Sequence, residues 1–440
     1  MKRSGTIRLA LHTYEWLWRG ATPFLGRNHR LRDGLPQRLG RSFPIDPMDI
    51  WIQAASAGES YLAGMILDTL GEDTPYRILV TTNTRQGKDI LDAVMQRLRS
   101  ASKRDQWASA FFPFDRPSLM QKAVDAIQPR IMVLLETEIW PGLMNAIKVK
   151  GIPMIIVNGR MQAKSLRHYQ LWPRFWHALG PDRIMAVSPA DADRYVCLYG
   201  TSRVSVMPNM KFDRVSTSPK TEQPDHVRRL IPAGTPFVVL GSVRQEEEAA
   251  VDQLIGYLLD RRPGILIGLF PRHMHRTAPW QKRLKAAGIT CHLRSRIDAP
   301  VNPGGVILWD VFGELTSGYA AATSAFVGGS LAPLGGQNFL EPLTCGIIPT
   351  IGPSWKTFEW VGPEIFSQGL VHVAEDWRQA GDHLLKAIEA PPPPQTVIDT
   401  LQRYVAERQG GTAMAVQAIE QLLEPQCPAD RDVVRQGQTS

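Results

Sequence analysis

The sequence predicts an α/β protein with two doubly wound parallel-sheet domains that face each other across a cleft. Short β-branched runs alternate with helical patterns from Asp49 onward, which is the rhythm of parallel strands joined by helices. This alternation stops in a polar stretch with two prolines at 214–226 and then begins again. A chain of 440 residues is long enough for two such domains, because one domain commonly holds roughly 100–200 residues.

Each half of the chain is expected to supply five strands. The first five lie at 50–54, 77–82, 130–135, 153–158 and 183–187. The second five lie at 236–240, 264–270, 305–309, 324–327 and 347–351. Their apolar residues follow one another without alternation, which is typical of strands buried on both faces. Ligands of such sheets bind beside the carboxyl ends of the strands.

The same patterns divide the chain into parts. These are a first segment at 1–46, a domain at 47–214, a linker at 215–226, a domain at 227–395, a helical segment at 396–424 and a flexible tail at 425–440. The helical segment follows a rigid run of four prolines. No internal repeat or low-complexity domain interrupts this order.

The first segment is amphipathic when it is drawn as a helix. One narrow stripe holds the polar side chains Arg8, His12, Glu15 and Arg19. The remaining surface is mostly apolar and includes two tryptophans and a tyrosine, which suit the interface of a membrane. A helix lying on an anionic membrane surface is therefore predicted, and a helix packed on the body of its own protein is the alternative. Because charges interrupt the apolar run, a cleavable signal peptide is not expected.

Charge and composition exclude several classes of protein. The net charge is +8, and residues 1–46 hold nine Lys or Arg against three acidic residues, so no basic folded face for nucleic acid is expected. The apolar runs are too short for a spanning helix. The four cysteines show no CxxC pair, which favours free thiols in a reducing cytosol. No HExxH or paired histidine cluster occurs, so no metal site is predicted.

Acidic residues follow two predicted strands of the first domain. Glu59 stands in the first turn of a helix that begins after Ser56, where a partly desolvated carboxylate suits a general base for an alcohol nucleophile. The alternative is that Glu59 only complements the helix dipole. Glu136 and Glu138 come directly after another apolar strand, and their side chains share a face if that strand continues. A capping role for these two acids is equally compatible with the sequence.

Phosphate-binding candidates follow strands of the second domain. Arg272 comes after an apolar strand, where its guanidinium can hold a phosphate in a bidentate fork. Gly313 opens a helix, and Asn338 to Glu341 end a glycine-containing loop whose acid can accept hydrogen bonds from ribose hydroxyls. Neither GxGxxG nor GxxxxGK[ST] occurs, so dinucleotide-binding and P-loop functions lose their main support.

Ten segments in order resemble one enzyme family. They read SAGES, TTNTRQG, FFPFDRP, ETEIWPGL, GIPMIIVNGRM, PNMKFD, LFPRHMHR, FGELTSGYA, AFVGGSLAPLGGQNFLEP and GGT. The sequence resembles the Kdo transferases, membrane-associated glycosyltransferases that attach 3-deoxy-D-manno-octulosonic acid (Kdo) to lipid A precursors in lipopolysaccharide inner-core biosynthesis. The resemblance implies the GT-B architecture of two Rossmann-like domains, the first binding the acceptor and the second the CMP-sugar.

The resemblance also implies roles for individual residues. Glu59 matches the general base, while Glu136 and Lys211 match positions that stabilise the transition state. The donor CMP-Kdo would be held by Pro271, Arg272, Gly313, Glu314, Leu315, Asn338, Phe339, Leu340 and Glu341. The implied reaction inverts the anomeric carbon, needs no metal or other cofactor, and takes place at the cytoplasmic face of the bacterial inner membrane.

The loops of the second domain depart from the family pattern at three places. These are Val243 to Gln245, Gln337, and Ser354 to Thr357. Two alternatives therefore stay open. One is a GT-B enzyme that uses another nucleotide sugar, such as a UDP-sugar transferase or epimerase. The other is a catalytically silent, membrane-bound relative.

Overall fold

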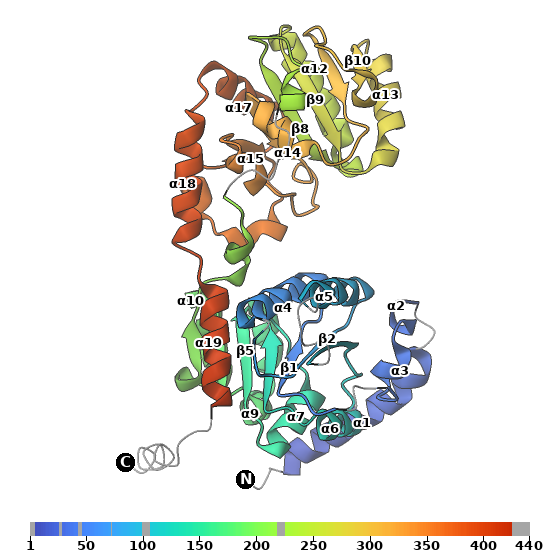
Figure 1. Ribbon diagram of the computed structural model, residues 1–440, viewed down its shortest axis with the longest axis vertical. Coiled ribbons are helices and arrows are strands. Elements are labelled where there is room, and N and C mark those ends of the chain that lie inside the picture. Colours follow the sequence, from blue (N-terminus) through green and yellow to red (C-terminus); the bar gives the residue numbers. More distant parts are fainter. Residues whose placement is uncertain are drawn as a thin grey trace. The chain divides into compact units, whose positions relative to one another are not determined.

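The computed structural model describes residues 5–25, 29–42, 46–71, 73–98, 106–217 and 225–424. The described chain forms two compact units (Figure 1). The first unit contains the chain up to Asp213 together with the part from Gln409 onward, and the second is Arg214–Arg408. Each unit holds one seven-stranded parallel sheet.

The first sheet has the strand order β3-β2-β1-β4-β5-β6-β7. Its strands are β1 (Ile50–Gln53), β2 (Ile78–Thr82), β3 (Trp107–Phe111), β4 (Ile131–Leu135), β5 (Met154–Gly159), β6 (Arg183–Ala186) and β7 (Val204–Val206). Every neighbouring pair is parallel. The strand order reverses direction between β1 and β4, which is where a doubly wound sheet opens a crevice for ligands.

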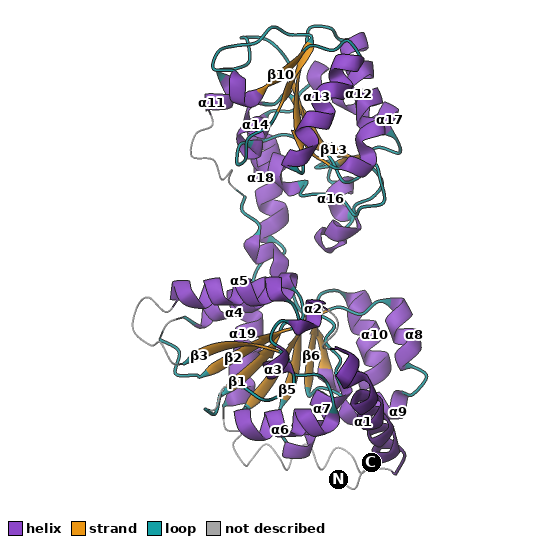
Figure 2. Ribbon diagram, turned by 90° about the vertical axis from the view of Figure 1, so that its right-hand side faces the viewer, coloured by secondary structure: helices purple, strands orange, loops and turns teal. Residues whose placement is uncertain are grey.

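Helices cover both faces of this sheet (Figure 2). One face packs on α4 (Ala57–Leu70), α5 (Arg85–Leu98) and α19 (Gly411–Leu423). The other packs on α1 (Gly5–Leu25), α6 (Pro117–Ile127), α7 (Pro141–Lys150), α8 (Ala163–Tyr169), α9 (Pro173–Leu179) and α10 (Pro189–Tyr199). Alternate strand residues serve the two faces, with Trp51 on the α1 side and Ile50 and Ile52 on the α4 side. Shorter helical elements are α2 (His29–Arg32), α3 (Leu35–Arg38), η1 (Thr201–Arg203) and η2 (Met210–Arg214).

Helix α1 docks on the first unit through one line of side chains. Ile7, Leu11 and Glu15 follow at intervals of four residues and are buried. The Glu15 carboxylate accepts hydrogen bonds from the Ser118 N–H at 2.9 Å and the Ser118 hydroxyl at 2.8 Å, so it caps the start of α6. The Tyr14 hydroxyl donates to Asp115 at 3.0 Å. One member of the predicted polar stripe is therefore a docking residue.

The opposite side of α1 remains apolar and exposed. Its large side chains are Leu9 (69% exposed), Trp16 (62%), Leu17 (67%) and Phe24 (62%). Packing on the protein body and an available apolar face thus occur in the same helix, although the sequence presented them as alternatives. No helix in the described ranges is long and apolar enough to span a membrane.

The second sheet has the strand order β10-β11-β9-β8-β12-β13-β14. Its strands are β8 (Phe237–Val243), β9 (Leu266–Pro271), β10 (Cys291–Leu293), β11 (Gly305–Leu308), β12 (Ser324–Val327), β13 (Pro349–Ile351) and β14 (His372–Val373). One face packs on α12 (Glu248–Arg261), α13 (Thr277–Ala286) and α17 (Trp377–Glu389). The order reverses between β8 and β12, so this pair forms the second crevice.

The remaining elements of the second unit are shorter or lie beside these layers. They are α11 (Asp225–Arg228), α14 (Leu315–Ala321), α15 (Leu340–Thr344), α16 (Glu364–Ser367), α18 (Pro394–Ala406), η3 (Gln245–Glu247), η4 (Met274–Arg276), η5 (Arg294–Arg296) and η6 (Lys356–Val361). Part of the expected linker, 218–224, and the expected tail, 425–440, lie outside the described residues.

The expected helical segment at 396–424 consists of two helices that belong to different units. The break between α18 and α19 falls at Gly410, whose φ of 96° suits a residue without Cβ. The Asp213 carboxylate accepts hydrogen bonds from the N–H of Gly410 and of Thr412, both at 2.7 Å, and thereby holds the start of α19. Two sequence motifs, PNMKFD and GGT, therefore meet to close the first unit.

Candidate active site

Glu59 lies at the crevice of the first sheet, in the first turn of α4 after β1. Its backbone N–H donates to the Ser56 hydroxyl at 3.3 Å, and the Ser56 N–H donates to the Glu59 carboxylate at 3.1 Å. This reciprocal pair is a capping box, so the structural role that the sequence offered for Glu59 is present. The side chain is only 8% exposed.

The environment of Glu59 also raises the pKa of its carboxyl group. Burial, followed by the charge of Glu136, raises the pKa of Glu59 to about 6. A carboxyl group with a pKa near 6 is ionised at neutral pH and is a stronger base than an ordinary glutamate. Capping and base chemistry are therefore compatible in this one side chain.

Glu136 and Lys211 form an ion pair beside Glu59. The Lys211 ammonium lies 2.7 Å from the Glu136 carboxylate. Glu136 follows β4, and Lys211 lies in η2, so the ion pair joins segments that are far apart in the sequence. Asn158 connects the same segments, since its amide contacts Glu136 at 3.5 Å and its carbonyl accepts the Met210 N–H at 2.9 Å. The structure thus brings together Glu59, Glu136 and Lys211, the three residues to which the family resemblance gives catalytic roles.

Backbone strain gathers around these side chains. Strand β4 ends at Leu135, and Glu136 adopts a left-handed φ of 54°, so the strand does not continue through Glu138. Asn158 has the same φ of 54°, and Ser242 in the second unit has a φ of 58°. Of the four non-glycine residues with positive φ among the described residues, Glu136 and Ser242 lie at the crevices of the two sheets, and Asn158 lies on the strand next to β4 and contacts Glu136. Such conformations concentrate at functional sites, where surrounding contacts maintain them.

Glu138 is a third acid of this cluster, to which the family resemblance assigned no role. It accepts a short hydrogen bond from the Trp140 indole N–H. Burial, followed by the charge of Glu59, raises the pKa of Glu138 to about 7. Its position two residues after Glu136 was visible in the sequence, but its closeness to the charge of Glu59 depends on the tertiary fold and could not be read there.

A cavity of about 150 Å³ lies at the carboxyl ends of β9 and β11 in the second unit. Five of the predicted donor residues line it, namely Pro271, Arg272, Gly313, Glu314 and Leu315. The exposed Arg272 is held at its backbone, where its N–H donates to the Val243 carbonyl at 2.8 Å. Phe270 and Trp309, whose ring centroids are 4.0 Å apart, form a stacked wall.

The Glu314 side chain is already engaged by its own unit. Arg294 donates to both of its oxygens, at 2.8 and 3.0 Å, and the Trp309 indole N–H donates at 2.8 Å. His226 approaches the same carboxylate at 3.2 Å. Glu314 therefore orders the wall of the cavity through its side chain, while Gly313, with a φ of 87°, offers backbone to it.

The second predicted donor segment, Asn338 to Glu341, does not line this cavity. Glu341 is nevertheless connected to the wall of this cavity. Its carboxylate accepts a 2.5 Å hydrogen bond from Thr316 of α14, the helix that begins at the lining residue Leu315. Phe339 and Leu340 are buried, and the ring centroids of Phe339 and Phe358 are 5.0 Å apart. Asn338 is exposed, and its side chain accepts the Leu340 N–H at 3.2 Å.

Glu247 is a buried residue of the second crevice that sequence reasoning missed. It is 2% exposed, and its carboxylate accepts the N–H groups of Gly329, Ser330 and Leu331 at 2.5, 3.1 and 3.1 Å. It thereby links the loop after β8 to the glycine-rich loop after β12. Glu246, Glu247 and Glu248 are consecutive, and the sequence gave no sign that Glu247 and Glu248 are buried while Glu246 is not.

Two places where the sequence departs from the family pattern lie against each other. The Gly335 N–H donates to the Ser354 hydroxyl at 2.8 Å, and the Thr357 N–H donates to the Gly335 carbonyl at 2.9 Å. The loop that ends in Gln337 and the segment Ser354 to Thr357 therefore form one hydrogen-bonded structure. Among the described residues, no group of three or more His, Cys, Asp or Glu is arranged to hold a metal ion.

Two parallel sheets of this topology, with candidate sites at their crevices, define the GT-B type of fold. A glycosyltransferase from Rickettsia africae has a similar solved structure, with 9% identity, a TM-score of 0.55, and coverage of 86% of this chain and 99% of that one. A UDP-GlcNAc 2-epimerase from Neisseria meningitidis bound to UDP-GlcNAc gives 13% identity, a TM-score of 0.51, and coverage of 86% and 99%. At these identities the likeness shows the fold alone.

Sequence relatives identify the family. A 3-deoxy-D-manno-octulosonic acid transferase from Bordetella pertussis is 32% identical over 424 residues, which cover 93% of this chain and 95% of the relative. The enzyme of the same name from Haemophilus influenzae is 29% identical and covers 83% and 84%. The family model described as 3-deoxy-D-manno-octulosonic-acid transferase (kdotransferase) matches residues 33–214. This chain belongs to the Kdo transferase family of glycosyltransferases.

Proposed function

We propose that this protein transfers Kdo from CMP-Kdo to a sugar hydroxyl of a lipid A precursor, with inversion at the anomeric carbon. The observation that carries the proposal is the cluster at the first crevice. There, a buried carboxylate with a pKa of about 6 lies beside the ion pair of Glu136 and Lys211, in a chain of the Kdo transferase family. The bound donor and acceptor supply the remaining reactants.

The chemical step balances without a further reactant. The acceptor oxygen forms a bond to the anomeric carbon of Kdo, the bond from that carbon to the phosphate oxygen of CMP breaks, and CMP leaves with the bonding electrons. Glu59 takes the proton of the acceptor hydroxyl. Because burial raises the pKa of Glu59 to about 6, its carboxylate is both ionised at neutral pH and basic enough to assist attack.

Lys211 and Glu136 control the charge around this base. Positive charge develops on the sugar ring and negative charge on the phosphate as CMP departs, so fixed charges placed before the reaction lower its barrier. We infer that Glu136 faces the developing positive charge and that Lys211 holds Glu136 in place. The hydrogen bond from Asn158 and the left-handed backbone at Glu136 support this positioning role.

The donor is proposed to bind the second unit at the cavity beside Arg272. A guanidinium at the end of β9 can hold the phosphate of CMP through two parallel hydrogen bonds. The stacked rings of Phe270 and Trp309 form an apolar wall beside it. Glu247, which holds three backbone N–H groups of the loop after β12, would keep the neighbouring crevice in shape.

The acceptor carries acyl chains, so the enzyme must work at a membrane surface. We propose that the exposed face of α1 inserts Trp16, Leu17 and their apolar neighbours into the cytoplasmic leaflet of the bacterial inner membrane. Glu15 and Tyr14 fix the opposite face of the helix to the first unit. The protein would then be a peripheral membrane enzyme.

A transfer assay with one conservative variant tests the function and the base together. The protein is incubated with CMP-Kdo, generated in situ, and a tetraacylated lipid A precursor, and the products are analysed by mass spectrometry. We expect Kdo adducts from the wild type and a rate lower by about 10²–10⁴-fold from Glu59→Gln, which keeps a capping oxygen but removes the base. Glu420→Gln, at an exposed position in α19, is the matched control and should retain the wild-type rate.

The outcomes separate the assignment of the base from the activity. A wild type that forms no Kdo adduct contradicts the proposed reaction. An active Glu59→Gln variant with the wild-type rate removes Glu59 from the mechanism and leaves the reaction in place. Thermal unfolding of both variants shows whether the capping box survives.

A further inference from the structure

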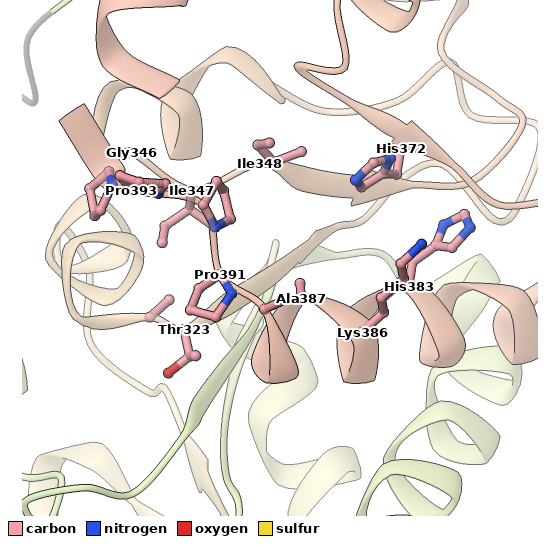
Figure 3. Close-up of a pocket in the computed structure, with 14 residues that line it drawn as sticks. Thr323, Gly346, Ile347, Ile348, His372, His383, Lys386, Ala387, Pro391 and Pro393 are labelled. Carbon is pink, nitrogen blue, oxygen red and sulfur yellow. The ribbon is translucent and has the colours of Figure 1, made fainter. Parts of the chain in front are cut away.

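The second unit has another, larger cavity. It lies at the amino ends of the strands, whereas the cavity beside Arg272 lies at their carboxyl ends. The volume of the larger cavity is about 560 Å³ (Figure 3). Thr323 precedes β12, Ile348 precedes β13, and His372 begins β14, so the three last strands of the sheet contribute to it. The two cavities share no lining residue. The larger one is therefore distinct from the proposed donor site.

One end of this cavity gathers nitrogen atoms. His372, His383 and Lys386 line it, and the two imidazole rings have centroids 5.4 Å apart. In Figure 3 the His383 side chain extends toward His372. The Nδ1 atom of His383 is buried and has no hydrogen-bond partner among the residues that the structure describes. A buried polar atom without a partner is uncommon, and a bound group that completes its hydrogen bond is one explanation.

The charges at this end favour an anion. Burial, followed by His383 and Lys386, lowers the pKa of His372. Burial also lowers the pKa of His383, where the charge of Asp382 opposes the shift and Lys386 adds to it. Protonation of both imidazoles beside Lys386 would bring like charges together, and an anion bound between them would relieve that repulsion. Asp382, the neighbouring acid on α17, accepts a hydrogen bond from the Tyr257 hydroxyl at 2.5 Å and is not a lining residue.

The other end of the cavity is apolar and rigid. It is formed by Ile347, Ile348, Ala387 and the proline run 391–394. Proline rings have a fixed backbone φ and present flat apolar surfaces, so this wall needs little ordering when a ligand binds. Gly346 allows the run to approach closely, because a Cβ at this position would lie 2.7 Å from the Pro394 Cα. The volume is within the range of small-molecule sites, roughly 300–1,000 Å³.

We propose that this cavity binds a small, soluble phosphomonoester whose body is an apolar ring. Two imidazoles and one ammonium provide three donors, which match the three terminal oxygens of a phosphomonoester better than the two of a carboxylate. The ring would lie against Ile348 and the prolines. Lys386 is the strongest anchor, since an ammonium group offers a charge-assisted hydrogen bond while the imidazoles supply N–H donors.

Phenyl phosphate is a suitable probe, because it joins a phosphomonoester to an apolar ring. The full-length protein is labelled with ¹³C at its histidine rings, and the signals of His372 and His383 are assigned with the His372→Gln and His383→Gln variants. Titration should move these two signals saturably. Three comparison compounds should each bind at least about ten-fold more weakly than phenyl phosphate. Inorganic phosphate lacks the ring, benzyl alcohol lacks the anion, and a short-chain phosphatidic acid is too large.

Three charge variants locate the binding. Lys386→Gln should weaken phenyl phosphate at least about ten-fold through the loss of a charge-assisted hydrogen bond. Lys282→Gln, at an exposed position of α13, is the matched control and should leave the affinity unchanged. Arg272→Gln should also leave the histidine signals and their midpoint unchanged, which separates this cavity from the donor site.

Several results would overturn the proposal. They are the absence of a saturable shift at His372 and His383, equal affinity in Lys386→Gln and wild type, and equal or tighter binding of inorganic phosphate or phosphatidic acid. Loss of the shifts in Arg272→Gln would assign the probe to the donor cavity instead. None of these results depends on whether the protein transfers Kdo, so the two proposals fail independently.

Discussion

Lys211 holds Glu136 through an ion pair of 2.7 Å, and Glu136 is the charged neighbour that adds to the raised pKa of Glu59. Three carboxylates, those of Glu59, Glu136 and Glu138, gather at the first crevice. Burial raises the pKa values of Glu59 and Glu138, and the charges of Glu136 and Glu59, respectively, raise them further. One lysine partly compensates this negative charge. The balance predicts how the protein responds to substitution and to pH.

Replacing Lys211 should impair transfer and also move its pH dependence. Lys211→Gln leaves the charge of Glu136 uncompensated, so the pKa of Glu59 should rise further above 6. We expect kcat/KM to fall by about 10²–10³-fold and its acid limb to move to higher pH. The measurement is the pH profile of kcat/KM. Lys148→Gln breaks an ion pair with Asp182 on the same unit and should leave the profile unchanged.

A purely structural role for Lys211 would give a different result. The rate would then fall together with the unfolding temperature, while the acid limb of the profile would stay near the wild-type position. That combination would remove Lys211 from the electrostatic control of Glu59.

The raised pKa of Glu138 predicts a pH-dependent stability. Because its folded-state pKa of about 7 lies above the ordinary value of 4.5, the folded protein binds this proton more tightly than the unfolded chain does. Stability is therefore lost as the pH rises from 4.5 through about 7. Glu138→Gln removes the ionisation and should increase the free energy of unfolding at pH 8 by roughly 1–3 kcal/mol.

Urea unfolding at two pH values checks this expectation. The gain from Glu138→Gln should be largest at pH 8 and should disappear near pH 4.5, where the wild-type carboxyl is already protonated. Glu420→Gln serves as the exposed control. An equal gain at both pH values would mean that ionisation of Glu138 is not its cause.

The interior strands of both sheets follow from the sequence, whereas the edge strands do not. All ten expected strands are present, with no end more than three residues from its expected position. The four unexpected strands are β3, β7, β10 and β14, which are the outermost strands of the two sheets. A central strand is buried on both faces and reads as an apolar run, while an edge strand such as Val204–Val206 is short and partly exposed. Its pairing depends on a neighbour that only the folded sheet supplies.

The candidate site divides in a similar way. Glu136 and Arg272 stand directly after strands, and Glu59 stands in the first turn of the helix that follows one, so their positions at the carboxyl ends of the strands follow from topology. Glu247 and Asn158 act through hydrogen bonds to segments about 50 or more residues away, such as Gly329 and Met210, and no local pattern announces such contacts. The engagement of Glu314 by Arg294 likewise depends on the tertiary fold.

The exposed face of α1 predicts membrane binding that can be removed without unfolding the protein. Trp16 and Leu17 are largely exposed, so their replacement costs the folded unit little packing. Burying one such side chain in the interface is worth roughly 1.5–3 kcal/mol. We expect Trp16→Ser with Leu17→Ser to lower the affinity for anionic vesicles by at least about ten-fold in co-sedimentation.

A matched pair of controls separates the membrane contact from the docking contact. Val206→Ser, at an exposed apolar position of β7, should leave vesicle binding unchanged. Glu15→Gln weakens the cap on α6 and should lower the unfolding temperature of the first unit. Wild-type co-sedimentation of the double variant would show that this face of α1 does not contact lipid.

Arg272 predicts a selective loss of donor binding. Its guanidinium is exposed at the cavity beside Phe270 and Trp309, while its backbone is fixed by the hydrogen bond to Val243. Arg272→Gln keeps that backbone contact and removes the cation, so we expect the KM for CMP-Kdo to rise by about ten-fold or more for the loss of one charge-assisted pair. The KM for the acceptor should remain constant, because Glu59, the proposed base that acts on the acceptor, belongs to the first unit.

Steady-state kinetics with each substrate varied in turn distinguish the two KM values. Arg296→Gln, at an exposed position in η5, provides the control. Equal changes in both KM values would contradict a donor-specific role, since a residue that grips only the CMP phosphate has no means of altering acceptor affinity.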